Sequence, residues 1–394
     1  MNSDLDDQSI PAFLILQDGT VFQGYGFGFS GKEAHGEVVF NTSMSGYQEM
    51  LTDPSYSGQI LVPTYPLQGN YGINNRDIES SQIQVSGFVA REYCEFPSNR
   101  YSDMTLNEYL KSESIPAIYG IDTRALTRRI RSYGVMMGLI TQSADIGAAE
   151  QKLNELPSYE DQNLVQRVST GETYSWPIEN EQLNDDESVH IVILDEGVKF
   201  NILRLLQNRG CKVTVVPSNV DFNYIMGLNP DGVLLSPGPG DPRYLDDIVE
   251  VTRKLVENVP VLGICLGHQV AARAFGAETY KLKFGHRGGN HPVKDLSTDM
   301  VRMTAQNHGY AVDVDSLPSE LKISQINLND GTVEGLEHTS LPVLTIQYHS
   351  EASPGPLENE FIFDRFLNLI DKTRYNRVEF VSLSVTGFVT DQCQ

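Results

Sequence analysis

The sequence predicts an α/β protein in two parts, with a doubly wound, mostly parallel sheet in the C-terminal half and a smaller, sheet-rich α+β domain before it. Three observations predict this arrangement. Short apolar runs alternate with helical patterns after residue 188, which is typical of parallel strands joined by crossover helices. Before residue 150, β-type runs are broken by Gly, Asn and Pro, and helical patterns are few. The length of 394 residues exceeds what a single ordinary core accommodates.

In the first half, one segment has clear helical spacing. Leu126 and Ile130 stand four residues apart, which predicts a helix over residues 123–133. This helix carries four arginines, which we interpret as a solvated face, an interface or anion site being the alternative. The arginines are Arg124, Arg128, Arg129 and Arg131. The predicted β-type runs are residues 13–16, 36–41, 59–64 and 83–90.

The second half is regular. The apolar run HIVIL predicts a buried strand, and Phe200, Leu203 and Leu206 then recur at helical spacing before Gly210. A later helix is expected to end at Gly276. Ligands on such sheets bind beyond the carboxyl ends of the strands, so the loops after the strands are the expected site. The predicted strands are residues 190–194, 212–216, 232–235 and 259–264, and the predicted helices are 200–206, the later part of 241–257, and 268–275.

An acidic segment divides the two halves. Residues 179–188 (ENEQLNDDES) hold five acids and no base, a composition that cannot bury enough apolar surface to order and that predicts a linker. We therefore divide the chain into an N-terminal domain (1–160), a connector with the linker (161–188), a second domain (189–375) and a tail (376–394). The tail alternates weakly, like an edge strand.

Composition excludes several classes of function. The net charge of −23 disfavours a nucleic-acid partner, because an acidic surface repels phosphates. The N-terminus lacks a secretion signal and no apolar run approaches the length of a membrane span, so we expect a soluble, cytoplasmic protein with no membrane partner. Its four cysteines form no CxxC pair, which disfavours a zinc ribbon or a disulfide framework and fits a reducing compartment.

The strongest local feature is Gly263-Ile264-Cys265-Leu266-Gly267, with a predicted strand before it and a predicted helix after it. This pattern is a nucleophile elbow with cysteine in place of serine. The turn puts Cys265 at a helix N-terminus, where the positive end of the helix dipole favours thiolate over thiol. The alternative is a buried cysteine beside glycines that allow close packing.

A cysteine nucleophile needs a base, and the base needs an orienting group. His349 follows an apolar run, and Glu351 lies two residues on, on the same side of an extended loop. His308 is either a pocket residue or a loop histidine bonded to backbone. His286 and His291 lack a third ligand at metal-binding spacing, so we expect no metal site. The Pro/Gly-rich loop at 236–242 offers N–H groups for an oxyanion hole, or is simply a rigid loop without a ligand.

Several segments carry a clear resemblance to a known family. GICLGHQ (263–269), SPGPGDP (236–242) and HSEASPGP (349–356) resemble the signatures of class I, triad-type glutamine amidotransferases. Four further segments are similar to the small-chain family of glutamine-hydrolysing carbamoyl-phosphate synthases, and the match runs from about residue 12 to about residue 372. They are FNTSMSGYQEMLTDPSYSGQI (40–60), GIDTRALTRRIR (120–131), FGHRGGNHPVKD (284–295) and AQNHGYAVD (305–313).

The resemblance implies a mechanism. Cys265 would attack the glutamine carboxamide to form a γ-glutamyl thioester, His349 would protonate the leaving ammonia and then activate water, and Glu351 would orient His349. The N–H groups of Gly240 and Leu266 would hold the oxyanion. The residues implied to contact glutamine are Ser55, Gly238, Gly240, Leu266, Gln269, Asn307, Gly309 and Tyr310.

The resemblance also implies partners. Residues 189–375 would be the amidotransferase domain, and the N-terminal domain would carry the interface with a separate large chain, as a heterodimer or a larger assembly. That chain would bind ATP, Mg and bicarbonate and make carbamoyl phosphate for arginine and pyrimidine biosynthesis, with no cofactor on this chain. Two residues depart from the family pattern: Ser350 replaces a proline, and Glu196 replaces an aromatic.

Three other functions compete with this interpretation. One is a glutaminase for a different synthase, against which the N-terminal matches argue. Another is a regulatory subunit with a degenerate triad, which the presence of Cys265, His349 and Glu351 disfavours. The third is a free-standing cysteine peptidase, which would share the elbow and hydrolyse peptides without a partner chain.

Overall fold

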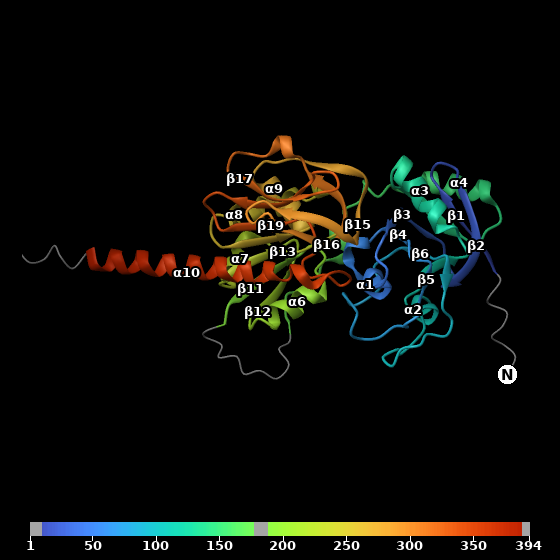
Figure 1. Cartoon of the computed structure of the whole chain (residues 1–394), viewed down its shortest axis with the longest axis horizontal. Helices are drawn as coiled ribbons and strands as arrows, with labels where there is room; N and C mark the ends of the chain where they lie inside the picture. Colours follow the sequence, from blue (N-terminus) through green and yellow to red (C-terminus); the bar gives the residue numbers. More distant parts are fainter. Residues whose placement is uncertain (1–9, 177–187, 388–394) are drawn as a thin grey trace, which may run out of the picture.

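The computed structural model describes residues 10–176 and 188–387, which form two lobes in contact with each other (Figure 1). The first lobe is a closed seven-stranded barrel with strand order β1-β2-β8-β6-β4-β3-β9. The sequence predicted a sheet-rich domain here, and its closure into a barrel is the new feature. The barrel strands are β1 (Pro11–Leu16), β2 (Val21–Gly28), β3 (Ala34–Asn41), β4 (Gln59–Pro63), β6 (Gly87–Val89), β8 (Pro116–Tyr119) and β9 (Met136–Thr141).

Successive side chains of each barrel strand point alternately into the barrel and out toward the helices that cover it. Leu14, Val38 and Ile60 project into one apolar cluster that also includes Leu126 and Ile130 of the helix predicted at 123–133. The opposite faces of the strands pack under most of the other helices of the lobe. The helices are α1 (Tyr47–Thr52), η2 (Pro54–Tyr56), α2 (Leu106–Ser112), α3 (Thr123–Tyr133) and α4 (Ile146–Glu155), and β5 (Leu67–Gln68) pairs with β7 (Glu92–Tyr93). The short α5 (Val165–Val168) follows, and its Val165 packs in a core of the second lobe.

The second lobe contains a ten-stranded sheet of order β10-β12-β11-β13-β14-β19-β18-β17-β15-β16. Its strands β12, β11, β13, β14 and β19 are mutually parallel, which confirms the predicted fold class. The strands are β10 (Tyr174–Ser175), β11 (His190–Asp195), β12 (Lys212–Pro217), β13 (Gly232–Leu235), β14 (Val261–Ile264), β15 (Thr279–Asp295), β16 (Val301–Val312), β17 (Leu321–Asn327), β18 (Val333–His338) and β19 (Val343–Ile346).

Helices cover both faces of the parallel strands. Ile191 and Ile193 of β11 point into a core shared with α6 and α10, whereas Val192 and Leu194 point into a core shared with α7, α8 and α9. Because both faces of β11 are buried, apolar residues follow one another without interruption in its sequence. The helices are α6 (Phe200–Gln207), α7 (Phe222–Gly227), α8 (Asp246–Leu255), α9 (Leu266–Ala274) and α10 (Phe361–Gly387).

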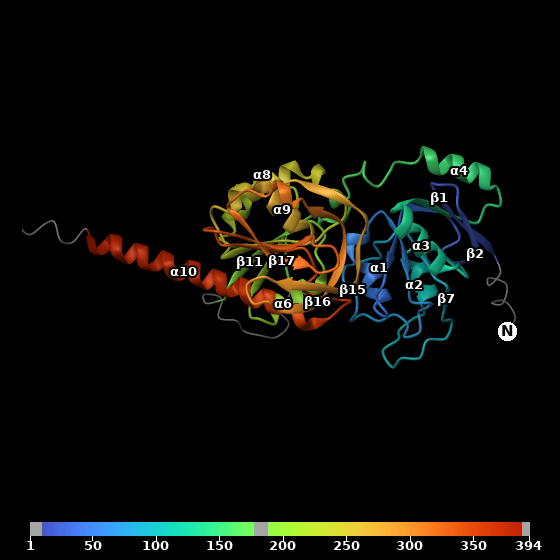
Figure 2. The same ribbon diagram turned by 45° about the horizontal axis from the view of Figure 1, so that its top comes forward.

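One prediction from the tail is wrong. The weak alternation after residue 375 suggested an edge strand, but α10 continues as a helix to Gly387 and extends away from the body in both ribbon views (Figure 2). A helix that is already nucleated over Phe363, Phe366 and Ile370 extends at little cost, whereas a strand needs a neighbouring strand to pair with. Most of the predicted linker, and the last seven residues of the tail, lie outside the described residues.

The long hairpin of β15 and β16 joins the two lobes. Lys281 of β15 lies 2.8 Å from Glu37 of the barrel, and the backbone N–H of Thr42 donates to the carbonyl of Arg287 at 3.3 Å. These contacts place the barrel against the carboxyl ends of the parallel strands, where the sequence predicted the site. None of the helices within the described ranges is long and apolar enough to span a bilayer.

Candidate active site

Cys265 occupies a sharp turn between β14 and α9. Its backbone angles, φ 54° and ψ −103°, lie outside the ordinary regions, a strain that clusters at functional sites. Glycine is required on its C-terminal side, because a Cβ at Gly267 would collide with the carbonyl of Leu235. The N–H of Cys265 donates to Ile346 O at 2.9 Å, which fixes the elbow to β19. The sequence-predicted strand–elbow–helix geometry is therefore present.

The structure brings His349 and Glu351 together beside Cys265. Nδ1 of His349 lies 2.6 Å from Oε1 of Glu351, and both side chains are buried. Burial lowers the pKa of His349, but the carboxylate of Glu351 and the sulfur of Cys265 raise it by more. Nε2 of the ring is buried and has no other hydrogen-bond partner. His349 is thus oriented on one side by a carboxylate, and its other nitrogen is free to serve the sulfur.

A buried lysine, which the sequence argument missed, completes this chain of charges. Nζ of Lys199 lies 3.1 Å from Oε1 of Glu351 and donates to the carbonyl of Ala352 at 2.5 Å. Burial raises the pKa of Glu351, but Lys199 and His349 lower it by more, so this carboxylate stays ionised. The sequence signal was the lysine three residues after Glu196, in the loop after β11, where ligands of parallel sheets bind.

The barrel supports the same chain of charges from the other side. Glu79 accepts from the backbone N–H of Asn201 at 3.1 Å and pairs with Arg204 at 3.0 Å, so it holds the start of α6. The side chain of Asn201 in turn donates to the carbonyl of Glu351 at 2.6 Å. Ser350, the departure from proline, has a buried hydroxyl with no hydrogen-bond partner, so the loop is held by its neighbours rather than by that hydroxyl.

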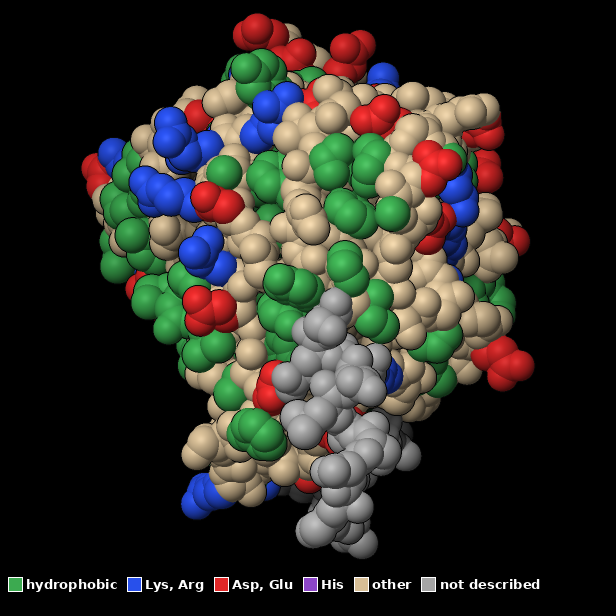
Figure 3. All heavy atoms as spheres, turned by 90° about the vertical axis from the view of Figure 1, so that its right-hand side faces the viewer, with side chains coloured by type: hydrophobic (Ala, Val, Ile, Leu, Met, Phe, Trp, Pro, Cys, Tyr) green, Lys and Arg blue, Asp and Glu red, His purple; other side chains and the backbone are tan. Residues whose placement is uncertain are grey.

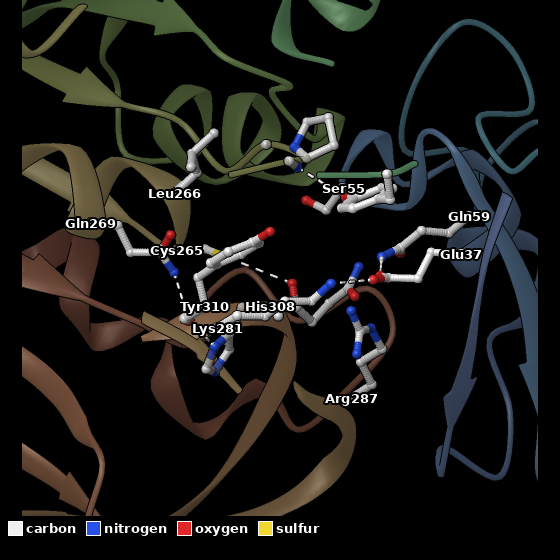
Figure 4. Close-up of a pocket in the computed structure, with 16 residues that line it drawn as sticks. Glu37, Ser55, Gln59, Cys265, Leu266, Gln269, Lys281, Arg287, His308 and Tyr310 are labelled. Atoms are coloured by element: carbon white, nitrogen blue, oxygen red, sulfur yellow. Dashed lines mark hydrogen bonds and ion pairs between the residues drawn. The ribbon is translucent and has the colours of Figure 1, made fainter. Parts of the chain in front are cut away.

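Cys265 lies in a pocket of about 390 Å³ between the lobes (Figure 4). All eight residues that the family resemblance assigned to glutamine line it, although His349 lines a neighbouring hollow of about 260 Å³ that shares Asn307. Asn307 is fixed across the lobes, since its side-chain amide donates to Asp53 at 2.9 Å. The eight residues are Ser55, Gly238, Gly240, Leu266, Gln269, Asn307, Gly309 and Tyr310.

Five further lining residues were not found from the sequence. Tyr159 comes from the end of the predicted N-terminal domain (1–160), and its hydroxyl accepts the N–H of Gly240 at 2.9 Å, the group expected to bind an oxyanion. The other four come from the barrel and from β15. Gln59 and Arg287 lie in segments that carry the family resemblance but were assigned no contact, and the convergence of all four depends on how the two lobes dock. They are Glu37, Gln59, Lys281 and Arg287.

Of the two histidines set aside as metal ligands, His286 lies in a cluster that spacing could not reveal, whereas His291 is not part of it. His286, His308 and Glu334 have potential ligand atoms within 4.8 Å of one another. Both oxygens of Glu334 already accept amide hydrogens, from Asn327 and Gln306, and both ring nitrogens of His308 are hydrogen-bonded. Burial lowers the pKa of His286, but Asp330 and Glu334 raise it to about 9. A protonated His286 is a counter-ion for these carboxylates, and the cluster offers no free ligand set.

Glu196, the other departure from the family pattern, is a buried carboxyl without a partner. It is 0% exposed, and neither side-chain oxygen makes a hydrogen bond. Burial raises the pKa of Glu196 well above its usual value, and the neighbouring Asp195 raises it further. The side chain is therefore neutral in the folded protein at neutral pH.

Two family models match the chain, and together they span both lobes. The model described as carbamoyl-phosphate synthase small chain, CPSase domain, matches residues 14–140, and the class-I glutamine amidotransferase model matches residues 192–369. The chain is 48% identical over 365 residues to the carbamoyl phosphate synthase small chain of Aquifex aeolicus, covering 91% of this chain and 98% of that protein. It is 52% identical over 359 residues to the Bacillus caldolyticus protein of the same name, covering 91% and 96%.

We predict that Glu196→Gln stabilises the protein increasingly as pH rises. The unfolded glutamate ionises above about pH 4.5 while the folded one stays neutral, so each pH unit in that window costs the wild type about 1.4 kcal/mol. The glutamine does not titrate and escapes this loss. Melting temperatures measured at pH 5 and pH 8 should diverge by at least about 2 °C in favour of the variant. Glu257→Gln, at an exposed glutamate, is the control, and a pH-independent difference would contradict the prediction.

Proposed function

This chain belongs to the carbamoyl-phosphate synthase small chain family and is its glutamine amidotransferase subunit, and from that premise we propose how its own residues hydrolyse glutamine. The observation that carries the proposal is the sequence of contacts from Cys265 through His349 and Glu351 to Lys199, at the edge of a pocket between the lobes. A nucleophile beside a base that is oriented by a carboxylate is the arrangement that covalent acyl transfer requires.

In the first step, the sulfur of Cys265 attacks the carboxamide carbon of glutamine. His349 receives the thiol proton and returns it to the leaving nitrogen, so the C–N bond breaks, ammonia departs and a γ-glutamyl thioester remains. In the second step, His349 takes a proton from water as the water oxygen attacks the thioester carbon. The C–S bond breaks, glutamate leaves, and the proton returns to the sulfur. His349 thus acts as base and acid in turn.

Two buried charges support the imidazolium that forms on His349. Glu351 is held ionised by Lys199, so its carboxylate stabilises the positive ring and fixes the Nδ1 proton toward itself. Without the lysine, the carboxylate would be buried with only a transient cation beside it, and burial would favour its protonation. Lys199 is accordingly a positioning residue, which acts on the reaction through Glu351.

The developing oxyanion requires N–H donors near Cys265. The N–H of Leu266 lies in the first turn of α9, at the positive end of the helix dipole. The N–H of Gly240 points into the pocket and is held by the Tyr159 hydroxyl. The Tyr159 hydroxyl oxygen thus occupies the acceptor position of this N–H. In the reaction, the substrate oxygen would replace it, and Tyr159 would move away.

The ammonia is expected to pass to a separate large chain. The relatives are named small chains, which supports a larger partner, and the sequence holds no phosphate-binding motif of its own. ATP and Mg would therefore bind on that partner, and this chain would need no cofactor. The two chains would form a heterodimer or a larger assembly in the cytoplasm.

Cys265→Ala should abolish glutamine-dependent synthesis in the complex reconstituted with the large chain. Loss of a covalent nucleophile costs at least about 10³-fold in rate, whereas synthesis from free ammonia should stay within about twofold of the wild type. Carbamoyl phosphate formation from each nitrogen source is the measurement. Cys94→Ser, which removes a free cysteine far from the elbow, is the matched control. Glutamine-dependent synthesis that survives in Cys265→Ala would refute the proposal.

The isolated chain should hydrolyse glutamine slowly, and adding the large chain should raise kcat at least about tenfold. The reason is that the residues around Glu351 are held partly by the barrel, whose expected partner contact would tighten them. Ammonia release with and without the large chain measures this. Equal turnover in the two conditions would argue against coupling.

Lys199→Met should shift the acid limb of the pH–kcat profile upward by at least about one unit. In the wild type the lowered pKa of Glu351 keeps it ionised throughout the neutral range, and without Lys199 that pKa rises, so activity is lost at a higher pH as pH falls. A fall in kcat of at least about tenfold at pH 7 should accompany the shift. Glutamine hydrolysis from pH 5 to pH 9 is the assay, with the exposed Lys254→Met as control. An unchanged limb would assign Lys199 a purely structural role.

A further inference from the structure

The first turn of α6 is capped by a residue of the other lobe. Lys199, which precedes the helix, makes no side-chain hydrogen bond to the N–H groups of that turn. Instead, the N–H of Phe200 donates to the backbone carbonyl of Glu79 at 2.8 Å, and the N–H of Asn201 donates to Oε2 of Glu79 at 3.1 Å. The free N–H groups at a helix start are usually satisfied by the residue just before the helix. Here the carboxylate that does so lies 122 residues away in the sequence.

The same carboxylate fixes the helix at a second point. Oε1 of Glu79 pairs with Arg204, further along α6, at 3.0 Å, and that arginine also donates to the carbonyl of Ile78 at 2.9 Å. Glu79 is itself held in the barrel lobe, since its N–H donates to the hydroxyl of Thr52, the last residue of α1, at 2.9 Å. Glu79 is 1% exposed, so these contacts are shielded from solvent. The position of α6, at the side of the second lobe that faces the barrel, is therefore set by the barrel lobe (Figure 1).

The capped turn carries the groups that hold the orienting carboxylate. The side-chain amide of Asn201 donates to the carbonyl of Glu351 at 2.6 Å, and Nζ of Lys199 lies 3.1 Å from Oε1 of Glu351. Asn201 joins the two lobes, because its N–H is bound by Glu79 and its side chain binds the loop that carries Glu351. Nδ1 of His349 lies 2.6 Å from the Glu351 carboxylate. A displacement of the Glu79 carboxylate is thus transmitted to the base through three successive short contacts.

We propose that Glu79 is a positioning residue for glutamine hydrolysis, which caps α6 from the barrel lobe and, through Asn201, fixes the loop that carries Glu351. This proposal rests on the proposed function, because it takes Glu351 as the group that orients His349. Glu79 lines neither the pocket around Cys265 nor the neighbouring hollow, so it acts on the reaction only through other residues. The docking of the barrel, and not the second lobe alone, then determines how well the base is oriented.

The test is Glu79→Gln, which keeps the size of the side chain but replaces one acceptor oxygen with an amide group that only donates. Ammonia release from glutamine is measured in the complex with the large chain. We expect kcat to fall at least about fivefold, because His349 is less well oriented, while KM changes less than about twofold, because the pocket lining is untouched. The substitution is buried and leaves the outer face of the barrel lobe unaltered, which Figure 3 shows end-on, so assembly with the large chain should be preserved.

Asn201→Ala tests the route from Glu79 to Glu351. It removes the amide that binds the Glu351 carbonyl but keeps the backbone N–H that Glu79 caps, so it should also lower kcat at least about fivefold. Adding Glu79→Gln to Asn201→Ala should then cost less than about a further twofold, because the link is already broken. Losses that multiply independently in the double variant would overturn the proposal.

Asp364→Asn is the matched control, because it also converts a carboxylate that anchors the α6 region into an amide. Asp364 pairs with Arg209, just beyond the C-terminal end of α6, at 2.7 Å and within the second lobe. Its kcat should stay within about twofold of the wild type. A loss equal to that of Glu79→Gln, or an unchanged kcat in Glu79→Gln or Asn201→Ala, would overturn the proposal and leave the Cys265 chemistry intact. Glutamine hydrolysis that persists in Cys265→Ala would instead refute the proposed function.

Discussion

The buried ion pair between Lys199 and Glu351 is the interaction on which the rest of the site depends. A carboxylate that is 0% exposed stays ionised only if cations lie beside it, and here they are Lys199 and His349. The lysine must in turn be held charged. Burial lowers its pKa, and Glu351, Asp53 and Glu79 raise it by more. Two of those three acids, Asp53 and Glu79, belong to the barrel lobe, so the charge state of the loop around Glu351 is set jointly by both lobes.

This dependence explains why the barrel packs where it does. The amidotransferase-like lobe supplies the elbow and the histidine, but one wall of the pocket comes from the segment around Ser55 and Gln59. Asp53 holds Asn307 by a 2.9 Å hydrogen bond, and the carbonyl of Asn307 is 3.7 Å from the Cys265 sulfur. A shift of the barrel by a fraction of an ångström would therefore alter both the pocket wall and the pairing of Lys199. Through these contacts, a partner chain that binds the barrel could influence the position of the Cys265 sulfur.

The sequence predicted the parallel strands and the grouping of Cys265, His349 and Glu351 because both depend on local pattern. Strand, elbow and helix are contiguous around Cys265, and His349 and Glu351 are two residues apart. Other features depend on pairings between segments far apart in the chain and were not predictable. They are the closure of the barrel, the ten-strand width of the second sheet and the positions of Lys199 and Arg287. The prediction for the tail was wrong because its weak apolar alternation does not stop a helix that is already packed from continuing past residue 375.

Two buried ionisable side chains in the turn after β11, Glu196 and Lys199, show the difference between a charge that the protein matches and one that it does not. Lys199 is matched by carboxylates of the protein itself, so its electrostatic contribution is present before any ligand arrives and is available to orient His349. Glu196 has no hydrogen-bond partner, and burial raises its pKa well above the usual value, so it brings no charge into the site. The presence or absence of a partner of opposite charge therefore decides which buried group contributes to the electrostatics of the site.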